Sequence, residues 1–181
     1  ELNDFKKSTS HYKEALKVIE TLHDPYMLAT TYNNLGQACW RHGNFKSSLE
    51  YYQKGLMALP IQFINADVTR NPTPSRLKAV TNEYIPAAIL WNKGDAWLGL
   101  FNQLHDTTFL RYAVDAYRNG DRMVDQMRWK QQSDQSKLFW REKTKRWYAK
   151  AIEASFLLGD ANAVFYFMEK SRAVLLNDKL A

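Results

Sequence analysis

Residues 29–60 alternate large and small side chains at helical spacing, and this alternation constrains the fold more than any other feature of the sequence. The large positions carry aromatic rings and one leucine, and the small ones carry glycine, serine or cysteine (Tyr32, Leu35, Phe45, Tyr52; Gly36, Cys39, Ser48, Gly55). Gly43 interrupts the period, and Pro60 ends it. Large side chains opposite small ones let two helices approach closely. The segment therefore predicts two antiparallel helices joined by a tight turn, with Tyr32 as an anchor between them.

The same spacing recurs on both sides of this segment. Residues 1–24 repeat the second helix alone, residues 86–125 repeat both helices, and residues 136–177 repeat both more weakly, with Ile152, Val164 and Met168 taken as packing positions. Helix pairs of this kind bury their apolar stripes only against their neighbours, so an array needs several units. We therefore expect one domain, 1–181, built as a stack of helix pairs.

The second full repeat is longer than the first. Gly36 and Ser48 are 12 residues apart, whereas the matching Gly94 and Ala113 are 19 apart. This difference predicts a seven-residue insertion in the turn of that repeat, around residues 101–108.

Residues 61–75 leave the helical pattern and form an expected connector. Pro72 and Pro74 make a continuous helix there unfavourable, and Ser75 is a suitable N-cap for a short helix. Pro86 is expected in the first turn of the long helix that follows.

The pattern of residues 29–60 resembles the 34-residue tetratricopeptide repeat. Aromatic, Leu-Gly, Gly, aromatic and Pro positions match that repeat, while Cys39 replaces an aromatic residue and Ser48 and Gly55 replace alanines. All three departures keep or reduce volume. The resemblance implies an all-α, right-handed α–α superhelix of helical hairpins with about seven or eight helices.

The C-terminal residues, 159–181, indicate a resemblance to one particular group of tetratricopeptide proteins. Its aromatic cluster, followed by Glu-Lys-Ser-Arg-Ala and a leucine pair, is similar to the helix that precedes the CHAT domain, a caspase-like cysteine peptidase domain of bacterial proteins with tetratricopeptide arrays. The resemblance implies that a CHAT domain follows Ala181 on the same polypeptide and carries the catalytic residues. It thus implies a bacterial scaffold that positions or regulates a peptidase, although a stand-alone adaptor stays open.

The sequence offers no cofactor, metal or catalytic site. The single cysteine, Cys39, lies three residues from His42, but a nucleophile–base pair is less favoured there than a buried packing cysteine. The histidines lack metal-ligand spacing, and no phosphate-binding glycine loop occurs. We therefore expect this segment to be a binding module and not an enzyme.

The net charge of +6 permits an acidic partner without requiring one. The most basic stretch, residues 137–150, interleaves six lysines and arginines with Trp140, Trp147 and Tyr148. Nucleic-acid binding there is an alternative, but the charges spread around the helix, so a solvated face is favoured. No apolar run is long enough to span a membrane. The opening at Glu1 indicates an internal piece without a targeting signal, and we expect a cytoplasmic protein.

The inner helices of such an array line a concave groove that binds proteins or peptides. The resemblance carries this role to positions of the first two repeats that would face the groove (Thr30, Asn33, Gln37, Trp40, Arg41; Ala88, Trp91, Asp95, Leu98). Amide side chains suit a peptide backbone, and Trp40 or Trp91 could hold an apolar side chain. Packing of these residues against the C-terminal helices of the same stack is the alternative.

Overall fold

The computed structural model describes the backbone of residues 2–130 and 134–176 and the side chains of residues 10–127 and 144–172. All regular structure in these ranges is helical, as the repeat pattern predicts. The eight helices of the described residues are α1 (Leu2–Leu22), α2 (Pro25–Arg41), α3 (Phe45–Ala58), α4 (Pro74–Leu77), α5 (Tyr84–Leu104), α6 (Thr108–Lys130), α7 (Asp134–Leu158) and α8 (Ala161–Leu176).

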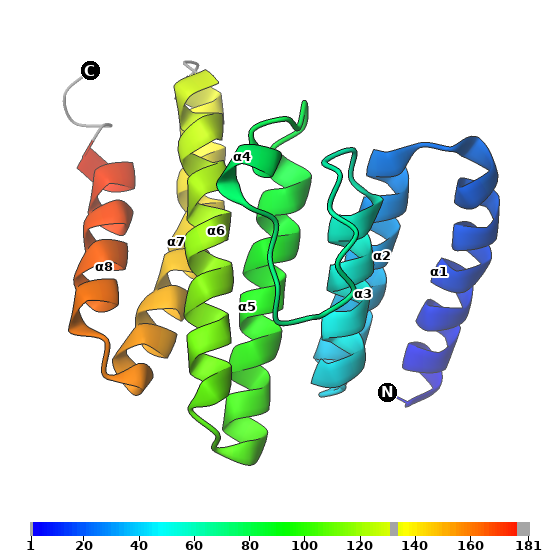
Figure 1. Ribbon diagram of the computed structural model, residues 1–181, viewed down its shortest axis with the longest axis horizontal. Helices are drawn as coiled ribbons and strands as arrows, with labels where there is room; N and C mark the ends of the chain where they lie inside the picture. The colour runs from blue at the N-terminus through cyan, green and yellow to red at the C-terminus, as the bar shows by residue number, and fades with distance from the viewer. Residues whose placement is uncertain (1, 131–133, 177–181) are drawn as a thin grey trace.

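The helices stack side by side as hairpins, with α1 and α8 at opposite ends of the row (Figure 1). Helices α2–α3, α5–α6 and α7–α8 form the three pairs, and contacts of α3 with α5 and of α6 with α7 join successive pairs. Helix α7 lies behind α6 in this view. The connector between α3 and α5 crosses in front of these two helices, α3 and α5. The result is a short helical solenoid, in which each pair gains burial from its neighbours.

The first hairpin forms as its sequence predicts. Pro25 opens α2, and the Asp24 carboxylate caps it by accepting from the backbone N–H groups of Tyr26 and Met27. Gly43 adopts φ +71° in the turn, and its N–H donates to the Trp40 carbonyl at 3.0 Å. The left-handed backbone conformation costs little free energy for glycine, because glycine has no Cβ. This explains why a glycine interrupts the helical period at the turn.

Size matching holds the two helices of a pair together, and the first two pairs use the same contact. A Cβ placed on Gly36 would lie 2.6 Å from Cδ1 of Tyr52, and one placed on Gly94 would lie 2.6 Å from Cδ1 of Tyr117. Both rings are fully buried. Tyr32, the expected anchor, is only half-buried and stacks on another tyrosine ring at the surface. The prediction of Tyr32 as the anchor was wrong, and Tyr52 has that role.

The seven extra residues of the second repeat extend its helices and do not enlarge its turn. Helices α5 and α6 have 21 and 23 residues, against 17 and 14 in α2 and α3. The turn of residues 105–107 is as short as that of residues 42–44. Predicting an insertion in the turn was therefore wrong, because residues 101–104 continue the apolar helical pattern of α5.

In the third pair the packing register differs by one residue from the predicted one. Ala163 and Phe167 are completely buried, whereas Met168, a predicted packing residue, is 40% exposed. Phe167 packs edge-on against Trp91 of α5, with ring centroids 6.5 Å apart. The break expected at residues 131–135 falls largely on 131–133, outside the described residues.

The connector ends in α4, whose N-cap is Thr73 and not Ser75 as predicted. Pro74 explains the difference, because its fixed φ suits the first helical position and moves the cap one residue before it. Pro86 lies in the first turn of α5, as predicted.

Candidate functional site

A pocket of about 290 Å³ opens between α2, α5 and α7, with one side chain from α3 in its wall. Its lining is mixed, with four aromatic rings, two amides, two guanidinium groups, one carboxylate and one methyl group. The lining residues are Gln37, Trp40, Arg41, Tyr52, Tyr84, Ala88, Asn92, Asp95, Arg146 and Trp147. Because α2, α5 and α7 are the first helices of successive pairs, this pocket lies where the repeat pattern places the groove.

Five of the predicted groove residues meet in this pocket: Gln37, Trp40 and Arg41 from α2, and Ala88 and Asp95 from α5. The half-buried Trp40 indole donates from Nε1 to the Asp95 backbone carbonyl at 3.3 Å, which ties α2 to α5 across the pocket wall. Arg41 is exposed at the end of α2. The pocket wall thus contains an indole whose polar atom is satisfied and a cation that remains open to solvent.

Thr30 and Asn33 are absent from the pocket lining. Thr30 is exposed and donates its hydroxyl to the Tyr26 carbonyl of its own helix at 2.8 Å. Asn33 is buried, and its Oδ1 accepts from Nδ2 of Asn92 at 2.9 Å. Asn33 therefore joins two helices, and its partner Asn92 is the amide that reaches the pocket.

Trp91 corrects the groove prediction, because its side chain is completely buried. It stacks on Trp147 with ring centroids 5.3 Å apart and lies 5.1 Å from the ring of Tyr117. A Cβ on Gly120 would lie 2.7 Å from Nε1 of Trp91, so a glycine on α6 provides the space for the indole. Leu98, the last groove position of this helix, is buried as well. The alternative interpretation, packing against the C-terminal helices of the stack, holds for Trp91, which contacts Trp147 of α7 and Phe167 of α8.

Asp95 is the carboxylate of the pocket and is largely removed from water. Its Oδ1 accepts from the Tyr117 hydroxyl at 2.7 Å. Burial raises the pKa of Asp95, while the hydrogen bond from Tyr117 and the positive charges of Arg146 and Lys150 lower it. The pKa of Tyr117 is raised by its own burial and then by the Asp95 charge. Tyr117 therefore keeps its proton and donates it in the hydrogen bond to Asp95, which lines the pocket.

Sequence reasoning missed the contribution of α7, which adds Arg146 and Trp147 to the pocket. These residues belong to the stretch interpreted as a basic helix. A signal was present, because Trp147 and Tyr148 precede Ala151 as Leu90 and Trp91 precede Gly94. Of the basic stretch, residues 137–143 lie outside the described side chains, and Lys150 pairs with Glu153 at 2.7 Å.

The surroundings of Cys39 disfavour a nucleophile–base pair with His42. Cys39 is buried, and burial raises the pKa of its thiol, which disfavours the reactive thiolate. His42 directly follows the end of α2, the helix that contains Cys39, and its side chain is exposed. No cluster of three potential metal ligands occurs among the described side chains. None of the described helices combines the length and apolar character needed to cross a bilayer.

The profile of the tetratricopeptide repeat matches residues 1–59, which comprise α1, α2 and α3. The chain matches no curated protein. Tetratricopeptide repeats are in general protein–protein interaction modules, and the match supports a tetratricopeptide region of non-catalytic, scaffold character over that part of the chain.

Proposed function

We propose that this chain is an interaction scaffold that binds an extended segment of a partner protein in the pocket between α2, α5 and α7. The observation that carries this proposal is the convergence of side chains from three successive pairs on one pocket. Binding sites in helical repeats arise from such shared inner surfaces, since no single pair encloses a ligand.

The lining indicates what the pocket would hold. Trp40 and Trp147 offer flat apolar surface for an aromatic or aliphatic side chain. The amide of Gln37 can bond to the backbone of an extended peptide. Arg41 and Arg146 are suited to a carboxylate, because a guanidinium binds carboxylates through two parallel hydrogen bonds. We infer a ligand segment that places an acidic residue next to an apolar one.

Calorimetry with synthetic peptides tests this proposal. Peptides that pair a tryptophan with a glutamate are compared with peptides that carry glutamine instead. Arg146→Gln should weaken binding of the glutamate peptides about tenfold, the effect of losing roughly 1.4 kcal/mol of charge-assisted bonding. Arg111→Gln is the matched control, since Arg111 is exposed on α6 and does not line the pocket. Equal losses in both variants, or equal affinity for both peptide sets, would contradict the proposal.

We also propose that the scaffold positions an adjoining CHAT peptidase domain, as the similarity of residues 159–181 to the helix preceding that domain suggests. The test is the complete reading frame, which should encode a strand-rich domain with a histidine and a later cysteine after this segment. Peptidase activity of the whole polypeptide should then change when this segment is deleted. A reading frame without such a domain would leave a stand-alone adaptor.

A further inference from the structure

The carboxylate of Asp95, in the wall of the proposed binding pocket, has more acceptor capacity than the chain uses. Its Oδ1 accepts from the Tyr117 hydroxyl at 2.7 Å. A carboxylate can accept about four hydrogen bonds through its two oxygens. Among the described side chains, no other group donates to Asp95, so Oδ2 is left open.

Oδ2 remains in contact with the pocket. In the part of the chain that the structure describes, Nε1 of Trp91 is the one polar side-chain atom that is fully buried without a hydrogen-bond partner. Oδ2 of Asp95 also has no such partner, so it is not sealed in the core. Because Asp95 lines the pocket, this oxygen is the part of the carboxylate that a ligand can reach.

The nearby cations do not pair with this carboxylate directly. Lys150 bonds to Glu153 at 2.7 Å, and Arg146 is exposed and makes no ion pair with Asp95. Burial raises the pKa of Asp95, and the charges of Arg146 and Lys150 oppose this shift only through space. A carboxylate that is largely removed from water without a bonded cation costs free energy, and a cationic ligand group would recover part of that cost.

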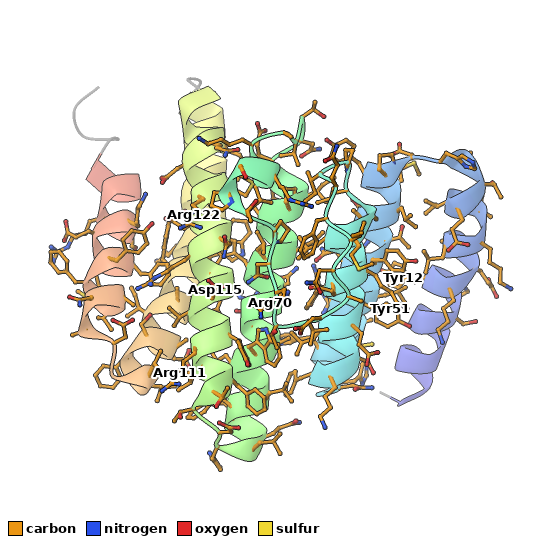
Figure 2. All side chains as sticks on the ribbon, viewed as in Figure 1. Tyr12, Tyr51, Arg70, Arg111, Asp115 and Arg122 are labelled. Atoms are coloured by element: carbon orange, nitrogen blue, oxygen red, sulfur yellow. The ribbon has the colours of Figure 1, made fainter. Side chains whose placement is uncertain are left out.

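Charged side chains of the neighbouring helix α6 lie elsewhere. Figure 2 shows Arg111, Asp115 and Arg122 along α6, which stands in front of α7 in this view. None of these three residues lines the pocket. A ligand cation at Asp95 would therefore meet no competing cation from these positions.

Indole rings lie beside the open oxygen. Nε1 of Trp40 donates to the Asp95 backbone carbonyl at 3.3 Å, which holds this ring next to Asp95. Trp147 stacks one face on the buried Trp91, with ring planes 7° apart, so its opposite face is the one that a ligand can contact. The face of an indole attracts a cation. The pocket thus offers a carboxylate oxygen and indole surface to the same ligand group.

We propose that Asp95 is a cation subsite of this pocket and receives the ammonium group of a lysine in the partner segment. The inference rests on the proposed peptide site and narrows its ligand to a segment in which lysine neighbours glutamate. The methylene groups of the lysine supply aliphatic surface for the two indoles, and the ammonium donates to Oδ2. The glutamate binds Arg41 or Arg146, which are both more exposed than Asp95.

The single open oxygen favours an ammonium over a guanidinium. A guanidinium binds a carboxylate best through two parallel bonds to its two oxygens, and the Tyr117 hydroxyl already occupies Oδ1 of Asp95. An ammonium is a compact charge that needs only one oxygen. The amino terminus of a peptide carries the same charge but has no flexible stem. Because Asp95 is half-buried, we expect a lysine side chain and not an amino terminus to reach it.

Calorimetry with short synthetic peptides tests this inference. The reference peptide is acetylated and amidated and places lysine next to glutamate. Three further peptides replace the lysine with norleucine, with arginine, or with a free amino terminus. Norleucine keeps the aliphatic stem and lacks the ammonium. The lysine peptide should bind about tenfold more tightly than the norleucine peptide, and also more tightly than the other two.

Asp95→Asn removes the charge and keeps an oxygen that can accept from Tyr117. In this variant the preference for lysine over norleucine should vanish, while the norleucine peptide should bind within about twofold of its wild-type affinity. Retained binding of norleucine also shows that the pocket has folded. Glu153→Gln is the matched control, because Glu153 is an exposed carboxylate whose charge acts on Asp95 without lining the pocket. This control should keep the preference for lysine.

Equal binding of the lysine and norleucine peptides to the wild type, or a preference that survives in Asp95→Asn, would overturn the cation subsite. Equal or tighter binding of the arginine or amino-terminal peptide would overturn the assignment to lysine. If the norleucine peptide binds and Arg146→Gln weakens it, the proposed peptide site stands without the subsite, whereas absence of binding by all four peptides would overturn both.

A second measurement needs no variant. In nuclear magnetic resonance spectra of the wild-type complex, the ε-methylene protons of the bound lysine should show nuclear Overhauser contacts with the Trp40 indole, which is held beside Asp95. A saturated complex without these contacts would overturn the proposal.

Discussion

Substituting Gly36 by alanine tests the size matching that holds each helix pair together. The new Cβ would lie 2.6 Å from Cδ1 of Tyr52, whereas carbon atoms in contact prefer about 3.5–4.0 Å. The ring or the helix must therefore move by roughly 1 Å, and overpacking of this kind costs about 1–3 kcal/mol. Alanine recovers up to about 1 kcal/mol through its higher helix propensity. The net expectation is a loss of about 1–2 kcal/mol.

A double-mutant cycle separates this contact from the propensity of alanine. Tyr52→Val removes the ring, so Gly36→Ala in that background should stabilise the protein by about 0.5–1 kcal/mol. Urea unfolding of the four proteins at neutral pH measures both steps. The account predicts a coupling energy of about 2 kcal/mol. Identical effects of Gly36→Ala in the two backgrounds would refute the size-matching argument.

Three further predictions concern other side chains. Tyr52→Ala should cost about 3–5 kcal/mol in urea unfolding, and Tyr32→Ala less than half of that, because only Tyr52 is fully buried; equal losses would contradict the assignment of the anchor. The Cys39 thiol should react with a thiol reagent far more slowly in the folded protein than in urea, since the side chain is buried and its pKa is raised; fast reaction of the folded protein would exclude burial. The lowered pKa of Lys93 means that the unfolded chain binds more protons between pH 7 and 10, so the free energy of unfolding of wild type relative to Lys93→Met should rise by up to about 1.4 kcal/mol per pH unit across that window; a pH-independent difference would contradict the lowered pKa.

Local patterns made the helix pairs predictable. The contact of Gly36 with Tyr52 follows from one spacing within one segment, and the glycine of the turn, Gly43, marks where the chain reverses. Local patterns did not predict which face of α8 packs against the rest of the stack. Val164 to Met168 are apolar or aromatic at all five consecutive positions, so the helical period does not select a face. Contact of Phe167 with Trp91 selects it.

The site depended on contacts between distant segments, which the sequence specifies only weakly. Three of the five positions predicted on α2, where the repeat pattern is strongest, line the pocket: Gln37, Trp40 and Arg41. Trp91 was misplaced because the space that buries it comes from Gly120, on another helix. The burial of Lys93 was equally hidden, since its acceptors come from the irregular connector between α3 and α5 and from α3 itself. Neither periodicity nor composition reports such partners.

The most direct test of the proposed binding pocket uses the indole N–H signals of tryptophan in a nuclear magnetic resonance titration. The probe is a synthetic peptide that pairs a tryptophan with a glutamate, deuterated so that only the protein signals are observed. The Trp40 and Trp147 signals should shift as peptide is added, because both indoles line the pocket, while that of Trp97, packed between Phe109 and Tyr112, should stay in place. Saturable shifts at Trp97 without any at Trp40 or Trp147 would place the ligand elsewhere and contradict the account.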